Sequence, residues 1–396
     1  MPGALDKIKV VDLTRTLAGP FCTMLMGDMG AEVVKVEEPT GGDETRKWTP
    51  FWNGESTQFL TFNRNKRSLA VNLKEPEGLK IVKDMAADAD VMIESFRAGT
   101  LDRIGLGYEE IKKMNPGVVY CSISGYGRTG PMADMPGYDL LIQAYSGLMN
   151  LTGNPDGSPL RIGFSLVDLF TGMMAYATIL TALRQKDQTG KGQWVEAALL
   201  DGQVAALSYH ATGFLGTGVE PTRMGSGHPS LVPYQAFTSN NGQFIIGCAN
   251  QGLWERMCTA IGQEGMLKDP RYIDNTERVA HRTECVDELN AVFATNTTDH
   301  WVDRIVEAGV PCGPINTVSD VVNNPQVLAR NMIAEVDHPS IPNLKFPGSP
   351  LKLTDSPATI RRVPPSLGQH NEEILVEAGY PAEIIADLKE RGVLGS

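Results

Sequence analysis

The residue best placed to do chemistry is Asp168, the one charge at the mouth of an apolar stretch. From Asp168 to Leu183 almost every residue is apolar or small, which predicts a helix buried on most sides and packed inside a domain. A carboxylate there can cap the free N–H groups of the first helical turn. The alternative is that it faces a ligand, because Gly163, Ser165 and Gly172 leave room for a close approach.

Two polar loops offer further candidate sites. The loop Thr14–Pro20 opens a helix, so its N–H groups could receive a phosphate or a carbonyl oxygen, or it could be a tight turn with Pro20 at the first helical position. It lacks the GxGxxG fingerprint of nicotinamide dinucleotide sites. Arg64, Lys66 and Arg67 could meet phosphates, although a solvated charge run before a strand is the commoner explanation.

The elements that must position these residues alternate between strand and helix. Residues 8–13, a helix to Met29 and residues 32–37 form a βαβ unit, which predicts a parallel sheet. The alternation continues with strands at 68–73, 91–94 and 118–123 and helices at 77–87 and 108–114. In such sheets ligands bind beyond the carboxyl ends of the strands.

The regular alternation of predicted strands and helices ends after Leu199. We predict a large α/β domain over residues 1–212, a linker over 213–224, a small α+β domain over 225–332, and a C-terminal segment, 333–396, that returns to the large domain. The recurring prolines from 337 to 365 indicate a segment that wraps around the surface.

Composition narrows the class of protein. The chain has 396 residues, 42% of them hydrophobic, and a net charge of -12, which argues against a nucleic-acid or anionic-membrane partner. The apolar runs look too short and too interrupted to span a bilayer, and no secretory signal is visible. Scattered cysteines and histidines predict reduced thiols, no metal site and a cytoplasmic location.

Several separated motifs, in order, give the chain a family resemblance. They are Asp12–Pro20, Gly30–Glu37, Asn63–Ser68, Ser122–Gly127, Asp168–Gly172, Thr189–Gln193 and Pro365–His370. With these the chain resembles the class III coenzyme A-transferases, the CaiB/BaiF family, over nearly its whole length. It is most similar to members that move CoA between dicarboxylates, through the residues Thr57, Asn63–Lys66, Tyr120–Gly127, Gly137–Asp139 and Val232–Phe237.

The resemblance implies a fold and a reaction. The fold is a large Rossmann-like parallel-sheet domain with a smaller α+β domain, in an interlocked homodimer. The reaction moves CoA from an acyl-CoA donor, such as succinyl-CoA, to a small dicarboxylate such as glutarate, itaconate, citramalate or mesaconate. Asp168 would be the nucleophile that forms a mixed anhydride and then an aspartyl-CoA thioester. No permanently bound cofactor is implied, because CoA and acyl-CoA are substrates.

The resemblance also assigns residues to CoA and to the acids. The positions that match the CoA site are Leu17, Ala18, Val71, Lys74, Phe96, Arg103, Gly137 and Tyr138. Glu38 departs from the family, whose members commonly carry Arg there, so Lys66 or Arg67 would have to compensate.

A second set of positions concerns the reacting acids. A Gly-rich loop that shields the site matches Gly247, Ala249, Asn250 and Gln251, and the candidate cations for a distal carboxylate are Arg46, Arg161, Arg223 and His228. Backbone N–H groups near Leu17, Ala18 and Asp168 are candidate oxyanion donors. Arg161 could equally be an ordinary surface arginine.

Two other functions remain as alternatives. The same fold houses α-methylacyl-CoA racemases, in which a His and an Asp share the transfer of the α-proton. The chain has Tyr138 where those enzymes have the His, and a phenol with a pKa near 10 is a poor partner for that transfer. A CoA-binding protein without chemistry is the other alternative, which the presence of Asp168 disfavours.

Overall fold

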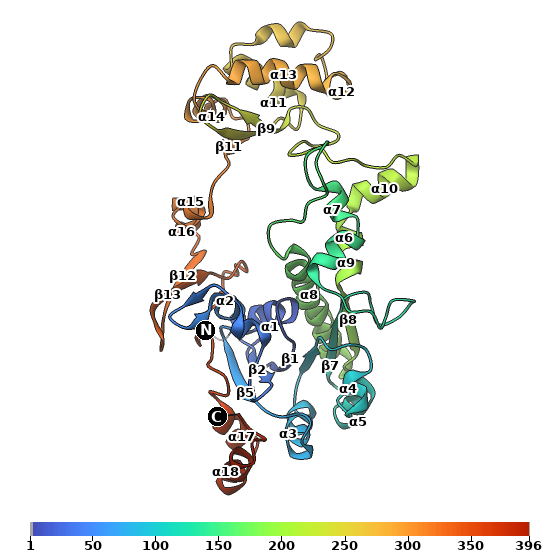
Figure 1. Ribbon diagram of the computed structural model, residues 1–396, viewed down its shortest axis with the longest axis vertical. Coiled ribbons are helices and arrows are strands. Elements are labelled where there is room, and N and C mark those ends of the chain that lie inside the picture. Colours follow the sequence, from blue (N-terminus) through green and yellow to red (C-terminus); the bar gives the residue numbers. More distant parts are fainter. Residues whose placement is uncertain (1–2, 396) are drawn as a thin grey trace. The chain divides into compact units, whose positions relative to one another are not determined.

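The computed structural model describes residues 3–395, and the larger of its two compact units is built around a parallel sheet (Figure 1). The sheet has six strands in the order β5-β2-β1-β6-β7-β8, which in chain order is third, second, first, fourth, fifth and sixth. This is the strand order of Rossmann dinucleotide-binding folds, so the prediction of a parallel α/β domain is confirmed. The strands are β1 (Lys9–Leu13), β2 (Glu32–Glu37), β5 (Lys66–Ala70), β6 (Val91–Glu94), β7 (Val119–Ser124) and β8 (Trp194–Ala198).

Helices cover both faces of this sheet because neighbouring strand residues are apolar on opposite sides. Val10 and Val33 pack in one core cluster, whereas Val11 and Val34 pack in another. The first cluster is shared with α1 (Ala18–Asp28) and α8 (Leu166–Thr189). The second is shared with α3 (Pro76–Ala87), α5 (Tyr108–Met114), α17 (Asn371–Glu377) and α18 (Ala382–Glu390).

The described chain divides into two compact units, whose bounds differ from the predicted domains. The large unit comprises the residues up to Leu148, Ile162–Gly216 and the residues from Gln326 on, and the small unit comprises Met149–Arg161 and Thr217–Pro325. The predicted 1–212 domain is therefore wrong at 149–161, a stretch that leaves the large unit between β7 and α8. The predicted 213–224 linker is also wrong at its start, because α10 (Ser208–Thr217) runs into it.

The small unit has its own sheet and its own core. Its strands β9 (Tyr234–Thr238), β10 (Gln243–Gly247) and β11 (Cys312–Pro314) are antiparallel. Its helices are α11 (Gln251–Ala260), α12 (Asn275–Ala280), α13 (Arg282–Phe293), α14 (Thr298–Glu307) and α15 (Val318–Val322), with a 3-10 turn η2 (Glu264–Lys268).

The remaining elements are short. They are η1 (Glu44–Lys47), β3 (Phe51–Trp52), β4 (Glu55–Ser56), α2 (Thr57–Phe62), α4 (Thr100–Arg103), α6 (Asp139–Tyr145), α7 (Leu148–Leu151), α9 (Leu199–Ala206) and α16 (Pro325–Ala329).

The C-terminal segment contains a hairpin that the sequence analysis did not predict. β12 (Ile333–His338) pairs with β13 (Ile341–Pro347) in a two-stranded sheet of its own, where prolines at free strand edges are tolerated. Farther on, the segment covers the edge strand β5: His370 Nδ1 accepts a hydrogen bond from Ser68 N at 3.2 Å, and Asn371 Oδ1 accepts one from Ala70 N at 2.8 Å.

The helix α8 is buried on one face, not on most sides as predicted. Val167, Ala175 and Ile179 are fully buried, whereas Phe170 and Met173 are 38% and 37% exposed. Contrary to the prediction about apolar runs, α8 is also long and apolar enough to cross a membrane, and among the described helices it is alone in this. Core helices of other proteins meet the same criterion, and α8 packs here against α1, β7 and β8.

Candidate active site

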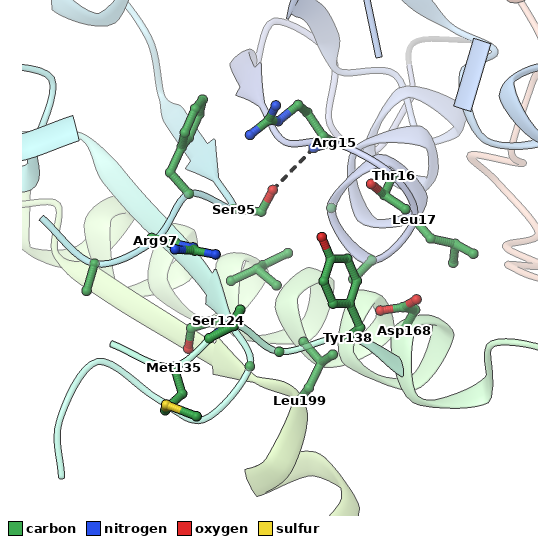
Figure 2. Close-up of a pocket in the computed structure, with 18 of the residues that line it drawn as sticks. Arg15, Thr16, Leu17, Ser95, Arg97, Ser124, Met135, Tyr138, Asp168 and Leu199 are labelled. Atoms are coloured by element: carbon green, nitrogen blue, oxygen red, sulfur yellow. Dashed lines mark hydrogen bonds between the residues drawn. The ribbon is translucent and has the colours of Figure 1, made fainter. Parts of the chain in front are cut away.

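A cavity of about 230 Å³ opens at the carboxyl ends of the parallel strands (Figure 2). It lies where β1 and β6 are neighbours and the chain leaves them in opposite directions across the sheet, the position at which ligands bind in open α/β folds. Loops after β1, β6, β7 and β8 line it, together with the first turn of α8. The lining includes Leu17, Ala18, Phe96, Gly137, Tyr138 and Asp168, the predicted site residues that the structure brings together.

Asp168 presents its carboxylate to this cavity without a partner. Its side chain makes no hydrogen bond and no ion pair to any residue from 3 to 395. Burial, and then the negative charge of Asp139, raise the pKa of Asp168 to about 7. The interpretation of Asp168 as a helix cap is therefore wrong, and its carboxylate is available for reaction.

Gly172 explains why Asp168 lies beside the first loop. A Cβ atom at Gly172 would be 2.6 Å from the carbonyl oxygen of Ala18, so only glycine lets α8 pack this closely on the start of α1. Asp168 is one helical turn before Gly172 and is carried to the same place. We expected Gly172 to make room for a ligand, but the backbone of Ala18 occupies the space beside it.

Buried ion pairs hold the loop that faces Asp168. Lys35 Nζ contacts Asp43 Oδ2 at 2.8 Å and donates to Thr14 O at 2.9 Å, and both side chains of the pair are fully buried. Asp43 also accepts hydrogen bonds from the N–H of Thr16, which adopts a left-handed φ of 73°. This loop therefore keeps its shape before any ligand binds.

The N-terminus of α1 supplies unpaired donors to the cavity. Leu17, Ala18 and Gly19 begin the helix, where N–H groups have no intrahelical partner, and all of them line the cavity. The backbone N–H of Asp168, which we also expected to be an oxyanion donor, instead points to Asp139 Oδ2 at 3.4 Å. The candidate oxyanion donors are thus those of α1 alone.

The predicted residues Val71, Lys74, Arg103 and Arg46 do not line the cavity. Val71 is 1% exposed in the core, and Lys74 and Arg103 are exposed outside the cavity. Arg46 forms two hydrogen bonds with Glu37, at 2.8 and 2.7 Å, and stacks on Phe59. Its charge is neutralised by Glu37, so Arg46 is not a free cation for a substrate carboxylate.

The basic run at the start of β5 is structural and not a phosphate site. Lys66 is fully buried, with Asp12 Oδ2 at 3.3 Å, and burial lowers the pKa of Lys66 to about 8. Arg64 pairs with Asp28 and Arg67 pairs with Glu373 and Glu377. Neither Lys66 nor Arg67 is therefore placed to compensate for Glu38.

Two cations in the cavity were missed by the sequence analysis. Arg15 follows β1 and Arg97 follows β6, and both line the cavity, with Tyr138 between Arg97 and Asp168 in the view of Figure 2. Arg15 Nη1 is 3.9 Å from Glu44 Oε1, and both side chains are about half exposed. The loops after adjacent strands at the reversal of strand order are the signal that could have identified them.

The other predicted residues, Arg161, Arg223, His228, Gly247, Ala249, Asn250 and Gln251, belong to the small unit. Asn250 caps α11 by accepting from Leu253 N, and Gln251 Nε2 donates to Ile273 O at 3.1 Å. Arg223 donates to Asn150 at 3.2 Å. Their roles toward the substrate stay predictions.

The geometry of the site fits an enzyme that uses a carboxylate as a nucleophile toward a carbonyl group. A partly buried carboxylate without partners, opposite free helix N–H groups in a Rossmann crevice, can attack a carbonyl whose oxygen those N–H groups hold. Among the described residues that line the cavity there is no histidine to share a proton with Asp168.

Comparison with known proteins agrees with this class. Residues 5–371 match the family described as CoA-transferase family III. The chain is 44% identical over 374 residues to the succinyl-CoA:glutarate CoA-transferase of Mus musculus, covering 94% of this chain and 86% of that one. It is 37% identical over 387 residues to the succinyl-CoA:mesaconate CoA-transferase of Haloarcula marismortui, covering 95% and 97%.

A solved structure is similar as well. A CAIB/BAIF family protein from Brucella suis superimposes with a TM-score of 0.85 and is 39% identical, covering 96% of this chain and 100% of that one. The chain therefore belongs to CoA-transferase family III and is a class III CoA-transferase, as the sequence motifs predicted.

Proposed function

We propose that this enzyme moves CoA from succinyl-CoA to a small dicarboxylic acid such as glutarate, itaconate, citramalate or mesaconate, with Asp168 as the nucleophile. The observation that supports it most is the unpartnered carboxylate of Asp168 opposite the N-terminus of α1. The names of the relatives from Mus musculus and Haloarcula marismortui support the choice of a succinyl donor and a dicarboxylate acceptor.

The proposed reaction conserves the energy of the thioester. A carboxylate oxygen of Asp168 attacks the thioester carbonyl, and the carbon–sulfur bond breaks to give a mixed anhydride and CoA thiolate. The thiolate then attacks the Asp168 carbonyl carbon of the anhydride, which releases the donor acid and leaves CoA on Asp168. The acceptor carboxylate reverses both steps and leaves as its own thioester.

The chain's own groups suit these steps. The N–H groups of Leu17, Ala18 and Gly19 begin α1 and line the cavity, so they suit the negative charge that develops on the carbonyl oxygen during each attack. Arg15 and Arg97 are the cavity's cations and suit the phosphates of CoA. We retain the Gly-rich loop at Gly247–Gly252 as the proposed shield against water.

We also propose that the enzyme is a homodimer, interlocked as the family resemblance implies. Three neighbouring helices of the large unit expose apolar side chains: Leu141 and Tyr145 on α6, Phe170 and Met173 on α8, and Val204 on α9. Exposed apolar groups gathered on adjacent helices are typical of a subunit interface.

Trapping the covalent enzyme tests the proposed function. The enzyme is incubated with succinyl-CoA without acceptor, treated with hydroxylamine, and digested for peptide mass spectrometry. We expect a hydroxamate on Asp168, none in the Asp168→Asn variant, and loss of the signal when glutarate is added before hydroxylamine. An unmodified Asp168, with exchange of the α-proton of a branched acyl-CoA in deuterated water, would instead identify a racemase.

A further inference from the structure

The start of α8 is capped by a residue from another helix. Ser165, at the N-cap position, makes no capping hydrogen bond with its side chain. Asp139 Oδ2, on α6, accepts instead from Val167 N at 3.0 Å and from Asp168 N at 3.4 Å. These are the second and third helical positions, the N–H groups that a capping side chain normally satisfies.

A second buried side chain holds Asp139 in place. Gln143 is one turn later on α6 and fully buried, and its Nε2 donates to Asp139 Oδ1 at 2.7 Å. Gln143 Oε1 accepts from Ile162 N at 2.9 Å, at the start of the loop that leads into α8. Both oxygens of Asp139 are thus occupied, and α6, this loop and α8 are joined by one network.

The network has two consequences for Asp168. Since Asp139 takes the N–H groups, Asp168 keeps its own lone pairs for the substrate. Since Asp139 is a buried like charge beside the partly buried Asp168, it disfavours the ionised form of Asp168 relative to any neutral form. The anhydride and the aspartyl-CoA thioester are such neutral forms, because acylation removes the charge of Asp168.

We propose that Asp139 is a positioning residue that caps the nucleophile's helix in place of Asp168 and, by its charge, favours the covalent intermediates. The inference rests on the proposed function, in which Asp168 is the nucleophile. Asp139 touches no reacting atom and acts through Asp168 alone.

Several other charged or titratable groups lie around the start of α8. The helices and strands packed on it contribute Asp28 from α1, Asp201 from α9 and Glu196 from β8, and the cavity adds Arg15, Glu44, Arg97, Asp134 and Tyr138. Among all of these and Asp139, Asp139 is the one whose charge acts on the pKa of Asp168.

A double variant separates the cap from the charge. In Asp139→Asn alone, the new amide group would face the amide of Gln143, so one hydrogen bond would be lost. In Asp139→Asn/Gln143→Glu, the asparagine oxygen can still accept from Val167 N and Asp168 N, and its amide can donate to the new glutamate. That glutamate can accept from Ile162 N, so every hydrogen bond is kept while the charge moves from residue 139 to residue 143, a hydrogen-bond length farther from Asp168.

The experiment compares the pH dependence of kcat/KM and the amount of trapped aspartyl-CoA thioester between the variants and the wild type. For the double variant we expect a wild-type melting temperature, an acid limb of kcat/KM displaced to lower pH by about one unit, and several-fold less aspartyl-CoA at pH 8. For Asp139→Ala, which loses cap and charge, we expect at least a tenfold lower kcat. The matched control is Asp274→Asn, since Asp274 caps α12 in the small unit by accepting from Glu277 N, and its pH profile should not move.

The outcomes that contradict the inference are distinct from those that contradict the function. If Asp139→Ala lowers the melting temperature but leaves kcat and the pH profile unchanged, Asp139 is a structural cap only. If the double variant keeps the wild-type profile and the wild-type yield of thioester, the charge has no role. In both cases the proposed function would stand if the Asp168→Asn variant is inactive and wild-type Asp168 is converted to the hydroxamate. An active Asp168→Asn variant would instead contradict the proposed function and the inference about Asp139.

Discussion

At the residue scale, the environment of Asp168 accounts for its chemistry. An ordinary aspartate is a weak nucleophile because water and hydrogen-bond donors stabilise its charge. Asp168 has less of both, because it is partly buried and the N–H groups of its own helix start are taken by Asp139. The same conditions that raise the pKa of Asp168 therefore make its ionised form more reactive.

The raised pKa of Asp168 predicts how kcat/KM falls at acidic pH. The nucleophile must be ionised, and the pKa of Asp168 is raised from 3.8 to about 7, so kcat/KM for succinyl-CoA should fall about tenfold per pH unit below pH 7. Steady-state rates between pH 5 and 9 check this. A profile that is flat down to pH 5 would show that the free enzyme's carboxylate keeps its ordinary pKa.

The same shift has a consequence for stability. Because the folded-state pKa lies above the unfolded value, the charged form of Asp168 destabilises the fold above about pH 7, and this cost is lost as the pH falls toward 3.8. Asp168→Asn should thus raise the melting temperature more at pH 8 than at pH 5, in the same buffers as the rate measurements.

At the element scale, the approach of α8 to α1 sets the distance between the proposed nucleophile and the proposed oxyanion donors. The two helices meet at Gly172 and Ala18, where an added methyl group would be 2.6 Å from a carbonyl oxygen. Backbone on both sides leaves no flexible side chain to yield, so the helices themselves must separate.

We therefore predict that Gly172→Ala lowers kcat at least tenfold while the protein still folds, because it displaces Asp168 from the N–H groups of α1. The matched control is Gly213→Ala in α10, also within a helix, where nothing lies within 4 Å of an added Cβ atom. Both changes improve helix propensity, so the two variants differ in the contacts of the new methyl group with Ala18 and Phe21 of α1. Wild-type kcat in Gly172→Ala would mean that this helix contact does not position Asp168.

At the scale of the whole molecule, the exposed apolar faces of α6, α8 and α9 are the feature that one chain leaves unexplained. Phe170 and Met173 lie one turn apart on α8 and would face water in a monomer. The opposite face of α8 is buried in the core of the large unit. A second copy of the chain is the occupant that we propose for the exposed face.

The homodimer predicts a mass of twice the 42.9 kDa of the chain in light scattering after size-exclusion chromatography. Met173→Glu should weaken the dimer, because a charge would be buried at the interface, and the effect should grow on dilution. Lys191→Glu, a charge change in the exposed turn after α8, serves as the control. A wild-type enzyme that is monomeric and fully active at micromolar concentration would contradict the proposal.

The sequence by itself determined the fold class and the family, and it indicated Asp168 as the candidate nucleophile. Strand–helix alternation in residues 8–37 and the apolar run after Asp168 are local patterns, and local patterns suffice to identify a parallel sheet and its helices. The strand β8 was not predicted because it lies at the edge of the sheet and is only partly buried. The hairpin of β12 and β13 was not predicted because prolines argue against strands.

Only the tertiary structure decided which candidate side chains are free to act. The sequence predicts Arg46 as a substrate cation, but Glu37 neutralises its charge. The sequence also allows Asp168 to be a helix cap, but Asp139, 29 residues away in the chain, takes that role. Capping and ion pairing depend on partners that folding brings together from distant positions. No local pattern specifies such partners, so the sequence supplied the reactive carboxylate and the tertiary structure determined why it is free to react.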